Sequence, residues 1–219
     1  MIISKLNSID SEIQLKIKEL NISNRKPEII AVSKTFGIDE IMPLINHGHI
    51  NFGENKVQES IEKWTKVKVD FKNIKLHMLG KIQTNKTKQV VDLFDYIHSL
   101  DSKKLAEKIS KEQEKKKKNL KIFIQVNIAN EIQKAGISIE NLNDFYNYCV
   151  HELKLNIIGL MCLPPNEEEP DLYFKKMIEL KDILGVKELS MGMSGDYLKA
   201  VIYGSTFVRI GSKIFGQRY

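Results

Sequence analysis

The feature of this sequence that most constrains its fold is a regular alternation of short apolar runs with amphipathic segments. Eight of the runs have the length and composition of β-strands, and nearly every one is followed by apolar residues at helical spacing. Continuous apolar runs are typical of parallel strands, which are buried on both faces. The expected strands lie at residues 29–32, 50–52, 74–79, 94–99, 120–128, 157–163, 188–191 and 206–210.

Eight strand and helix units in regular succession predict an α/β protein, built as a single (β/α)8 barrel of the TIM type. A doubly wound open sheet is the alternative, but eight regular units favour closure. Residues 2–20 precede the first strand and have helical spacing, so we expect an extra N-terminal helix. No linker divides the chain, and its 219 residues suit one domain spanning residues 1–219.

The charge of the chain suits an anionic ligand without identifying one. The formal net charge is +6, and it comes from abundant lysine, a balance that can favour phosphorylated or nucleic-acid partners. The densest basic run, Lys115–Lys118, follows two glutamates near the end of an expected helix and contains no aromatic residue. These features favour a solvated helix end over a nucleic-acid contact. We therefore expect no nucleic-acid partner.

The cysteines and the amino terminus bear on the compartment. Cys149 and Cys162 are far apart, and their spacing matches neither a CxxC motif nor a zinc site, so we expect buried free thiols and no metal. The amino terminus lacks the apolar core of a signal peptide, and no apolar run is long enough to span a bilayer. The expectation is a cytoplasmic protein with no membrane partner.

Lys34 is the first candidate functional residue. The apolar run of the first strand leads directly into Ser33, Lys34 and Thr35. The carboxyl ends of barrel strands form the ligand face, so Lys34 is expected there. A lysine among apolar neighbours can lose its proton and attack a carbonyl carbon to form a Schiff base. A solvated lysine at a strand end is the alternative.

The ends of the last two strands carry small and hydroxyl-bearing residues. Ser194 follows the seventh strand, and Gly211 and Ser212 follow the eighth. Barrels often bind phosphate at these two positions, where backbone amides and hydroxyls can approach an anion. Glycines and serines that only turn the chain are the alternative.

Two polar residues lie inside expected strands. Arg209 is in the last strand, and an arginine buried there needs a partner, for which Glu54 at another strand end is one candidate. His77 lies between two apolar residues of the third strand. A lone histidine of this kind is more often a hydrogen-bonded core residue than a catalyst.

Seven blocks of sequence occur in a fixed order, and together they are more specific than any one motif. They closely resemble the YggS/PROSC family of pyridoxal-phosphate homeostasis proteins, which have an alanine racemase-like barrel of fold-type III. The resemblance extends from about residue 28 almost to the end. The blocks are AVSKT, NFGENKVQE, HMLGKIQTNK, QVNIANEIQKAGI, GLMCLPP, LSMGMSGD and GSTFVRIGSKIFGQR.

The resemblance implies a cofactor, pyridoxal 5′-phosphate, and the residues that bind it. Lys34 would carry the cofactor as an internal aldimine, and Arg209 would face the pyridine nitrogen. Ser194, Gly211 and Ser212 would hold the phosphate. Four further residues would lie near the ring: Asn55, His77, Met191 and Met193.

Three positions depart from the commoner family pattern: Lys81, Gly195 and Ser212, where threonine is usual. Ser212 keeps the hydroxyl, and none of the three changes removes a group that the cofactor needs. Lys81 could alter the charge at the mouth of the site.

The family implies a role in vitamin B6 homeostasis, in which the protein binds pyridoxal 5′-phosphate reversibly and buffers it or delivers it to apo enzymes. An arginine only donates hydrogen bonds, so the ring nitrogen facing Arg209 should stay unprotonated and be a poorer electron sink. Racemases of this fold type add a β-rich domain that supplies a tyrosine across a dimer interface. This sequence ends soon after the eighth strand, so we expect a monomer without amino-acid turnover.

The alternative function is a pyridoxal-phosphate-dependent amino-acid racemase or a related aldimine enzyme. Tyr197 or Tyr203 would then have to reach into the site as the second acid or base, although core or surface positions are commoner for tyrosine.

Overall fold

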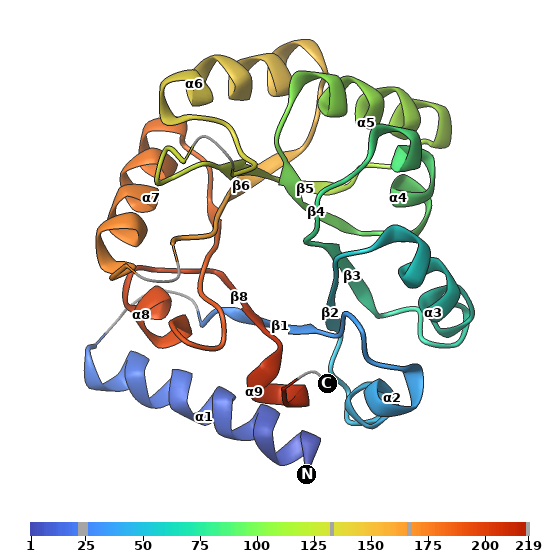
Figure 1. Cartoon of the computed structure of the whole chain (residues 1–219), viewed down its shortest axis with the longest axis vertical. Helices are drawn as coiled ribbons and strands as arrows, with labels where there is room; N and C mark the ends of the chain where they lie inside the picture. Colours follow the sequence, from blue (N-terminus) through green and yellow to red (C-terminus); the bar gives the residue numbers. More distant parts are fainter. Residues whose placement is uncertain (22–25, 132–133, 166–167, 218–219) are drawn as a thin grey trace.

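The computed structural model describes residues 1–21, 26–131, 134–165 and 168–217. Eight parallel strands form a closed barrel at the centre of the molecule, and helices surround it (Figure 1). This architecture confirms the predicted barrel. The strands are β1 (Glu28–Val32), β2 (Asn51–Glu54), β3 (Lys75–Met78), β4 (Tyr96–Leu100), β5 (Lys121–Val126), β6 (Ile157–Cys162), β7 (Glu188–Ser190) and β8 (Phe207–Ile210).

The barrel closes because each strand pairs with the next and β8 pairs with β1. In the register of this last pair, Ile30 of β1 lies beside Arg209 of β8. On the other side of β1, Val32 lies beside Gly53 of β2. All eight pairs are parallel, so the carboxyl ends of the strands meet at one end of the barrel.

The helices follow the strands in the expected alternation. The π-helical segment η2 continues α6, so that one expected helix at residues 139–153 is present as two segments. The helical elements are α1 (Ile2–Glu19), α2 (Ile38–Asn46), α3 (Val57–Asp70), η1 (Thr84–Lys86), α4 (Thr87–Leu93), α5 (Lys103–Lys116), α6 (Ile139–Asn147), η2 (Tyr148–Glu152), α7 (Asp171–Leu184), α8 (Tyr197–Ile202) and α9 (Ser212–Phe215).

The extra helix α1 lies outside the barrel and contacts α8 and α9 (Figure 1). Leu6, Ile9 and Ile13 form its buried face, as the helical spacing predicts. Glu12 accepts a hydrogen bond from the Lys213 ammonium group at 2.8 Å and another from the hydroxyl of Tyr197. These contacts tie the first helix to the elements on either side of β8.

Buried side chains form two groups because successive strand residues point to opposite faces of the barrel wall. The larger group joins strands to helices and includes Ile29 and Ala31. The smaller group includes Ile30, on the opposite face of β1, and consists of Ile30, Tyr96, Phe123, Met161 and Phe207. Rings of His77 and His98 stack on members of this smaller group, so the barrel interior is partly polar.

Two further sequence-based expectations concern the cysteines and membrane-spanning helices. Cys149 and Cys162 are buried free cysteines, as predicted. Among the described residues, no helix is long and apolar enough to cross a membrane.

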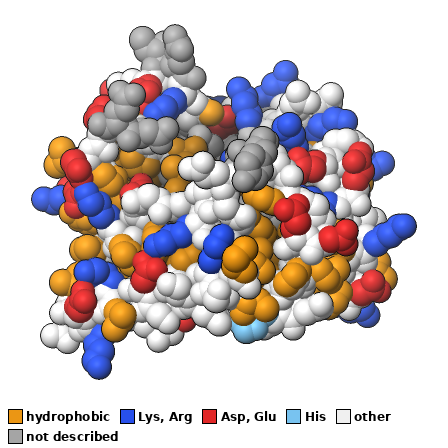
Figure 2. Space-filling model, turned by 60° about the horizontal axis from the view of Figure 1, so that its bottom comes forward, with side chains coloured by type: hydrophobic (Ala, Val, Ile, Leu, Met, Phe, Trp, Pro, Cys, Tyr) orange, Lys and Arg blue, Asp and Glu red, His pale blue; other side chains and the backbone are white. Residues whose placement is uncertain are grey.

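Figure 2 shows lysine and acidic side chains intermixed over the face turned toward the viewer, without a large area of positive or of negative charge alone.

Candidate functional site

A cavity of about 800 Å³ opens at the carboxyl ends of the strands. The structure brings seven of the nine predicted site residues to its wall, from the ends of β1, β2, β7 and β8. These residues are Lys34, Asn55, Met193, Ser194, Arg209, Gly211 and Ser212. A volume of this size lies in the range of small-molecule and cofactor sites.

Lys34 follows β1 and is half-buried at the cavity wall. The next residue, Thr35, has φ of 72°, a left-handed conformation that is unfavourable for a β-branched residue. The backbone amide of Thr35 donates to Glu59 Oε1 at 2.7 Å, and this bond holds the strained turn. Strain of this kind is often found at functional sites, where surrounding contacts maintain it.

Glu54 and Lys63 fix the backbone at Ser33, the residue before Lys34. The Ser33 hydroxyl donates to Glu54 Oε1 at 2.7 Å, and the Lys63 ammonium group donates to the Ser33 carbonyl oxygen at 3.0 Å. Trp64 Nε1 donates to the same carboxylate at 3.0 Å. Lys34 therefore extends from a backbone that is anchored on both sides.

Arg209 lies in β8 with only 5% of its surface exposed. Its Nη1 donates to the Ser190 hydroxyl at 2.7 Å, and its Nη2 donates to the Cys162 carbonyl oxygen at 2.8 Å. These neutral acceptors take the place of Glu54, the partner considered from the sequence, because Glu54 pairs with Lys63. Burial lowers the pKa of Arg209 from its ordinary value, but a guanidinium group stays protonated in proteins.

Hydrogen-bond donors converge beside Ser194. The backbone amides of Gly211 and Lys213 point at the Ser194 hydroxyl oxygen, at 3.3 and 3.4 Å. Ser212 also lines this cavity. Two amides that share one oxygen, with two hydroxyl groups beside them, form a set of donors suited to an anion such as phosphate.

Asn55 and Met193 reach the wall because the backbone is packed closely behind them. A Cβ atom at Gly80 would lie 2.2 Å from the carbonyl oxygen of Asn55, so only glycine allows this approach. The amide of Met193 donates to Asp196 Oδ1 at 2.6 Å, which fixes the turn after β7.

The structure does not bring His77 to the cavity. Its ring is fully buried in the barrel interior, stacked on Tyr96 with ring centroids 4.2 Å apart. Met191 is also fully buried, in the large core cluster, and does not line the cavity. Both belong to strand ends that the sequence places near the site, but their side chains point elsewhere.

Lys134 lines the cavity, although the sequence analysis did not assign it a site role. It lies in the loop after β5, and two strand-end residues brace that loop. Asn127 Nδ2 donates to the Glu131 carbonyl oxygen at 2.9 Å, and Gln125 Nε2 donates to the Ala135 carbonyl oxygen at 3.0 Å. Lys134 could have been considered from the sequence, because its loop follows a strand that ends in the polar residues Gln125 and Asn127.

The hydroxyl groups of Tyr197 and Tyr203 have partners outside the cavity. Tyr197 contacts Glu12 and accepts from Lys213 Nζ at 2.7 Å, and Tyr203 donates to Asp171 Oδ1 at 3.1 Å. Neither tyrosine lines the cavity wall.

Comparison with protein families gives one match over most of the chain. The model of the alanine racemase N-terminal domain matches residues 11–219. A protein of Haemophilus influenzae called pyridoxal phosphate homeostasis protein is 36% identical, over 97% of this chain and 94% of the relative. A protein of the same name from Aquifex aeolicus is 34% identical, over 98% of this chain and 97% of the relative.

Solved structures also resemble this chain over most of its length. PipY of Synechococcus elongatus without PLP superposes with a TM-score of 0.81 at 32% identity, covering 93% of this chain and all (100%) of PipY. A second PipY structure, with PLP bound, gives a TM-score of 0.79 at 31% identity and the same coverage. Alanine racemase from Corynebacterium glutamicum shares the fold, with a TM-score of 0.67 at 14% identity over 62% of its length.

Proposed function

The chain belongs to the family of pyridoxal phosphate homeostasis proteins, and from this premise we propose that it binds pyridoxal 5′-phosphate reversibly on Lys34. In this proposal the protein buffers the cofactor or delivers it to apo enzymes, and keeps the concentration of free aldehyde low. The PLP-bound structure of PipY supports the choice of cofactor.

The observation that carries the proposal is the meeting of three chemical groups in one cavity. Lys34 supplies an amine, Arg209 supplies a buried cation, and the donors around Ser194 and Gly211 suit an anion. Pyridoxal 5′-phosphate supplies an aldehyde that a lysine amine attacks to form a Schiff base, and a phosphate that such donors hold. Each group that binding requires is therefore present on this wall.

In this proposal, Arg209 is the reason that the protein holds the cofactor without turning over an amino acid. Its guanidinium group only donates hydrogen bonds, so a ring nitrogen facing it stays unprotonated. Two of its N–H groups are committed to Ser190 and Cys162, which limits its freedom to turn away. A ring with an unprotonated nitrogen stabilises a carbanion poorly, so proton removal from a bound amino acid is disfavoured.

A titration with pyridoxal 5′-phosphate tests this function directly. We expect a visible absorption band to appear at a stoichiometry of one cofactor per chain, and dilution or competing apo enzyme to remove it. Amino-acid turnover is followed in the same preparation with stereochemical detection. Absence of the band would refute the binding proposal, and racemisation at enzymatic rates would replace the homeostasis role with the racemase.

A further inference from the structure

A row of hydrogen bonds runs through the barrel interior and ends at Arg209. Arg209 Nη1 lies 2.7 Å from Ser190 Oγ, which lies 2.9 Å from His98 Nδ1. His98 Nε2 lies 3.0 Å from His77 Nδ1, and His77 Nε2 lies 3.1 Å from Asn51 Oδ1. These five side chains come from five different strands, so the row crosses the interior from one end of the barrel toward the other.

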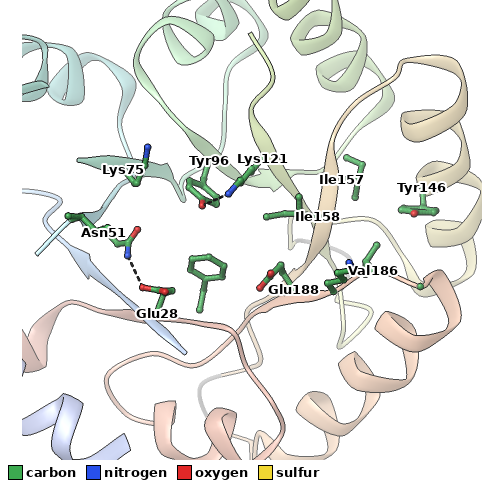
Figure 3. A pocket seen from close by; sticks show the side chains of 14 residues that line it. Glu28, Asn51, Lys75, Tyr96, Lys121, Tyr146, Ile157, Ile158, Val186 and Glu188 are labelled. Atoms are coloured by element: carbon green, nitrogen blue, oxygen red, sulfur yellow. Dashed lines mark hydrogen bonds between the residues drawn. The ribbon is translucent and has the colours of Figure 1, made fainter. Parts of the chain in front are cut away.

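The row continues to a carboxylate at the amino-terminal end of the barrel. Asn51 Nδ2 lies 3.2 Å from Glu28 Oε2, a contact drawn in Figure 3. We call the whole series the interior chain. Its members in order are Arg209, Ser190, His98, His77, Asn51 and Glu28.

The Glu28 end fixes the direction of every hydrogen bond. A carboxylate only accepts, so Asn51 must present its amide nitrogen to Glu28 and its amide oxygen to His77. His77 must then donate from Nε2 and accept at Nδ1. The same step repeats at His98, which donates from Nε2 to His77 and accepts at Nδ1 from the hydroxyl of Ser190.

The Arg209 end requires the same direction independently. An arginine only donates, so the Ser190 oxygen must accept from Arg209 and its hydroxyl hydrogen is left for His98. The two ends agree, and every bond in the interior chain points from the cation toward the carboxylate. Hydrogen bonds aligned in this way polarise one another and are stronger than isolated ones.

The imidazole rings stay neutral and fixed in orientation. Burial lowers the pKa of His77 to about 3 and also holds the pKa of His98 well below its usual range. The His77 ring stacks on Tyr96, and the His98 ring stacks on Phe123 at 4.3 Å between centroids. Because the Arg209 guanidinium group only donates, the direction does not invert, and the interior chain is not a proton wire.

The far end of the interior chain lies in a second cavity of about 490 Å³. Figure 3 shows it from close by, with Glu28, Asn51, Lys75 and Lys121 among the side chains that line it. This cavity is formed by the first residues of the strands and shares no lining residue with the one that contains Lys34. The interior chain therefore joins two separate cavities.

We propose that Ser190, His98, His77 and Asn51 are positioning residues, which hold the Arg209 guanidinium group in place and make its orientation depend on the hydrogen bond between Asn51 and Glu28 in the amino-terminal cavity. The role toward the cofactor rests on the proposed function, because it requires a pyridine ring against Arg209. The direction of the interior chain does not depend on the cofactor.

The direction is tested first in protein without cofactor. Nitrogen-15 NMR of the histidine rings should show His77 and His98 as neutral tautomers with the proton on Nε2, at neutral and mildly acidic pH. A proton on Nδ1 of either ring, or a charged ring at neutral pH, would overturn the proposal.

The positioning role is tested by the spectrum of bound pyridoxal 5′-phosphate. Ser190→Ala should raise the dissociation constant roughly tenfold, because Arg209 loses an acceptor in the protein interior. It should also shift the pH at which the bound cofactor changes its absorption. Asn51→Leu, which changes no residue of the Lys34 cavity, should raise the dissociation constant by roughly two- to threefold and shift this pH in the same direction as Ser190→Ala.

Two control variants separate positioning from general loss of stability. Ser60→Ala removes a buried hydroxyl that donates to the Lys56 carbonyl oxygen at the start of α3, and Lys75→Met changes the amino-terminal cavity outside the interior chain. Both should keep the wild-type spectrum and affinity. Wild-type behaviour of folded Ser190→Ala and Asn51→Leu would overturn the proposal, and an effect of Ser190→Ala alone would refute its dependence on the amino-terminal cavity.

Failure of the proposed function gives a different result. If the wild type binds no pyridoxal 5′-phosphate while NMR shows both Nε2 tautomers, the interior chain is established and its role toward the cofactor is refuted.

Discussion

Lys63 on α3 reaches across to Glu54 on β2, and its ammonium nitrogen lies 2.9 Å from Glu54 Oε1. The glutamate side chain is fully buried and the lysine side chain is 7% exposed. The lysine also holds the carbonyl oxygen of Ser33, the residue before Lys34. This buried ion pair therefore supports both the fold and the position of Lys34.

Removing one partner of this pair should cost stability. Lys63→Met leaves the Glu54 carboxylate buried without its counter-charge, a change that typically costs about 3–5 kcal/mol. Chemical denaturation should show this loss in the free energy of unfolding. Lys66→Met, at an exposed position on the same helix, should stay within about 0.5 kcal/mol of the wild type. Equal stability of the two variants would show that the pair contributes little.

Reversal of charge at Arg209 should weaken cofactor binding or change its absorption. Arg209→Glu places a carboxylate beside the Ser190 hydroxyl and the Cys162 carbonyl oxygen, and it could favour a protonated ring nitrogen. Because the new charge is buried, circular dichroism must confirm folding, and Arg209→Gln provides a neutral comparison. A folded Arg209→Glu protein with the wild-type spectrum and affinity would show that Arg209 does not face the ring.

Most strands could be predicted from the sequence because their apolar runs are continuous. The positions of individual side chains could not, because strand register decides them. His77 was expected near the cofactor, but it faces the barrel interior. The partners of Arg209 lie on β6 and β7, 47 and 19 residues before it, and only the closed barrel brings them together. Helix α9 was missed because four residues are too few to show helical spacing.

Burial of His77 should make the protein less stable in acid. Its folded pKa of about 3 lies below the unfolded value of about 6.5, so the unfolded chain binds more protons between these values and stability falls as pH falls. Lowering the pH from about 6.5 to about 4.5 should cost about 2–3 kcal/mol from this group.

The pH dependence is measured by urea unfolding of the wild type and two variants. His77→Leu should reduce the slope of unfolding free energy against pH, whereas His47→Asn, at an exposed position, should leave it unchanged. The same slope in all three proteins would contradict a neutral, buried His77.

The amine and the phosphate donors should contribute separately to affinity. Lys34→Ala should abolish the visible aldimine band but keep phosphate-dependent binding, because hydrogen bonds to a charged group contribute roughly 1.5–3 kcal/mol each. Ser194→Ala should weaken binding of pyridoxal 5′-phosphate more than binding of pyridoxal. Titration of both ligands against both variants and the wild type measures this. No discrimination between the ligands by the wild type would show that the loops after β7 and β8 do not hold phosphate.

The most direct measurement is the identity of the lysine that carries the cofactor. Borohydride reduction of the protein loaded with pyridoxal 5′-phosphate, followed by peptide mapping, should place the phosphopyridoxyl group on Lys34. Lys134 is the informative competitor, because it lines the same cavity and has the same reactive group. A label mainly on Lys34, and its loss in Lys34→Ala but not in Lys134→Ala, is the predicted result. A label mainly on Lys134, Lys81 or Lys115–Lys118 would contradict the account.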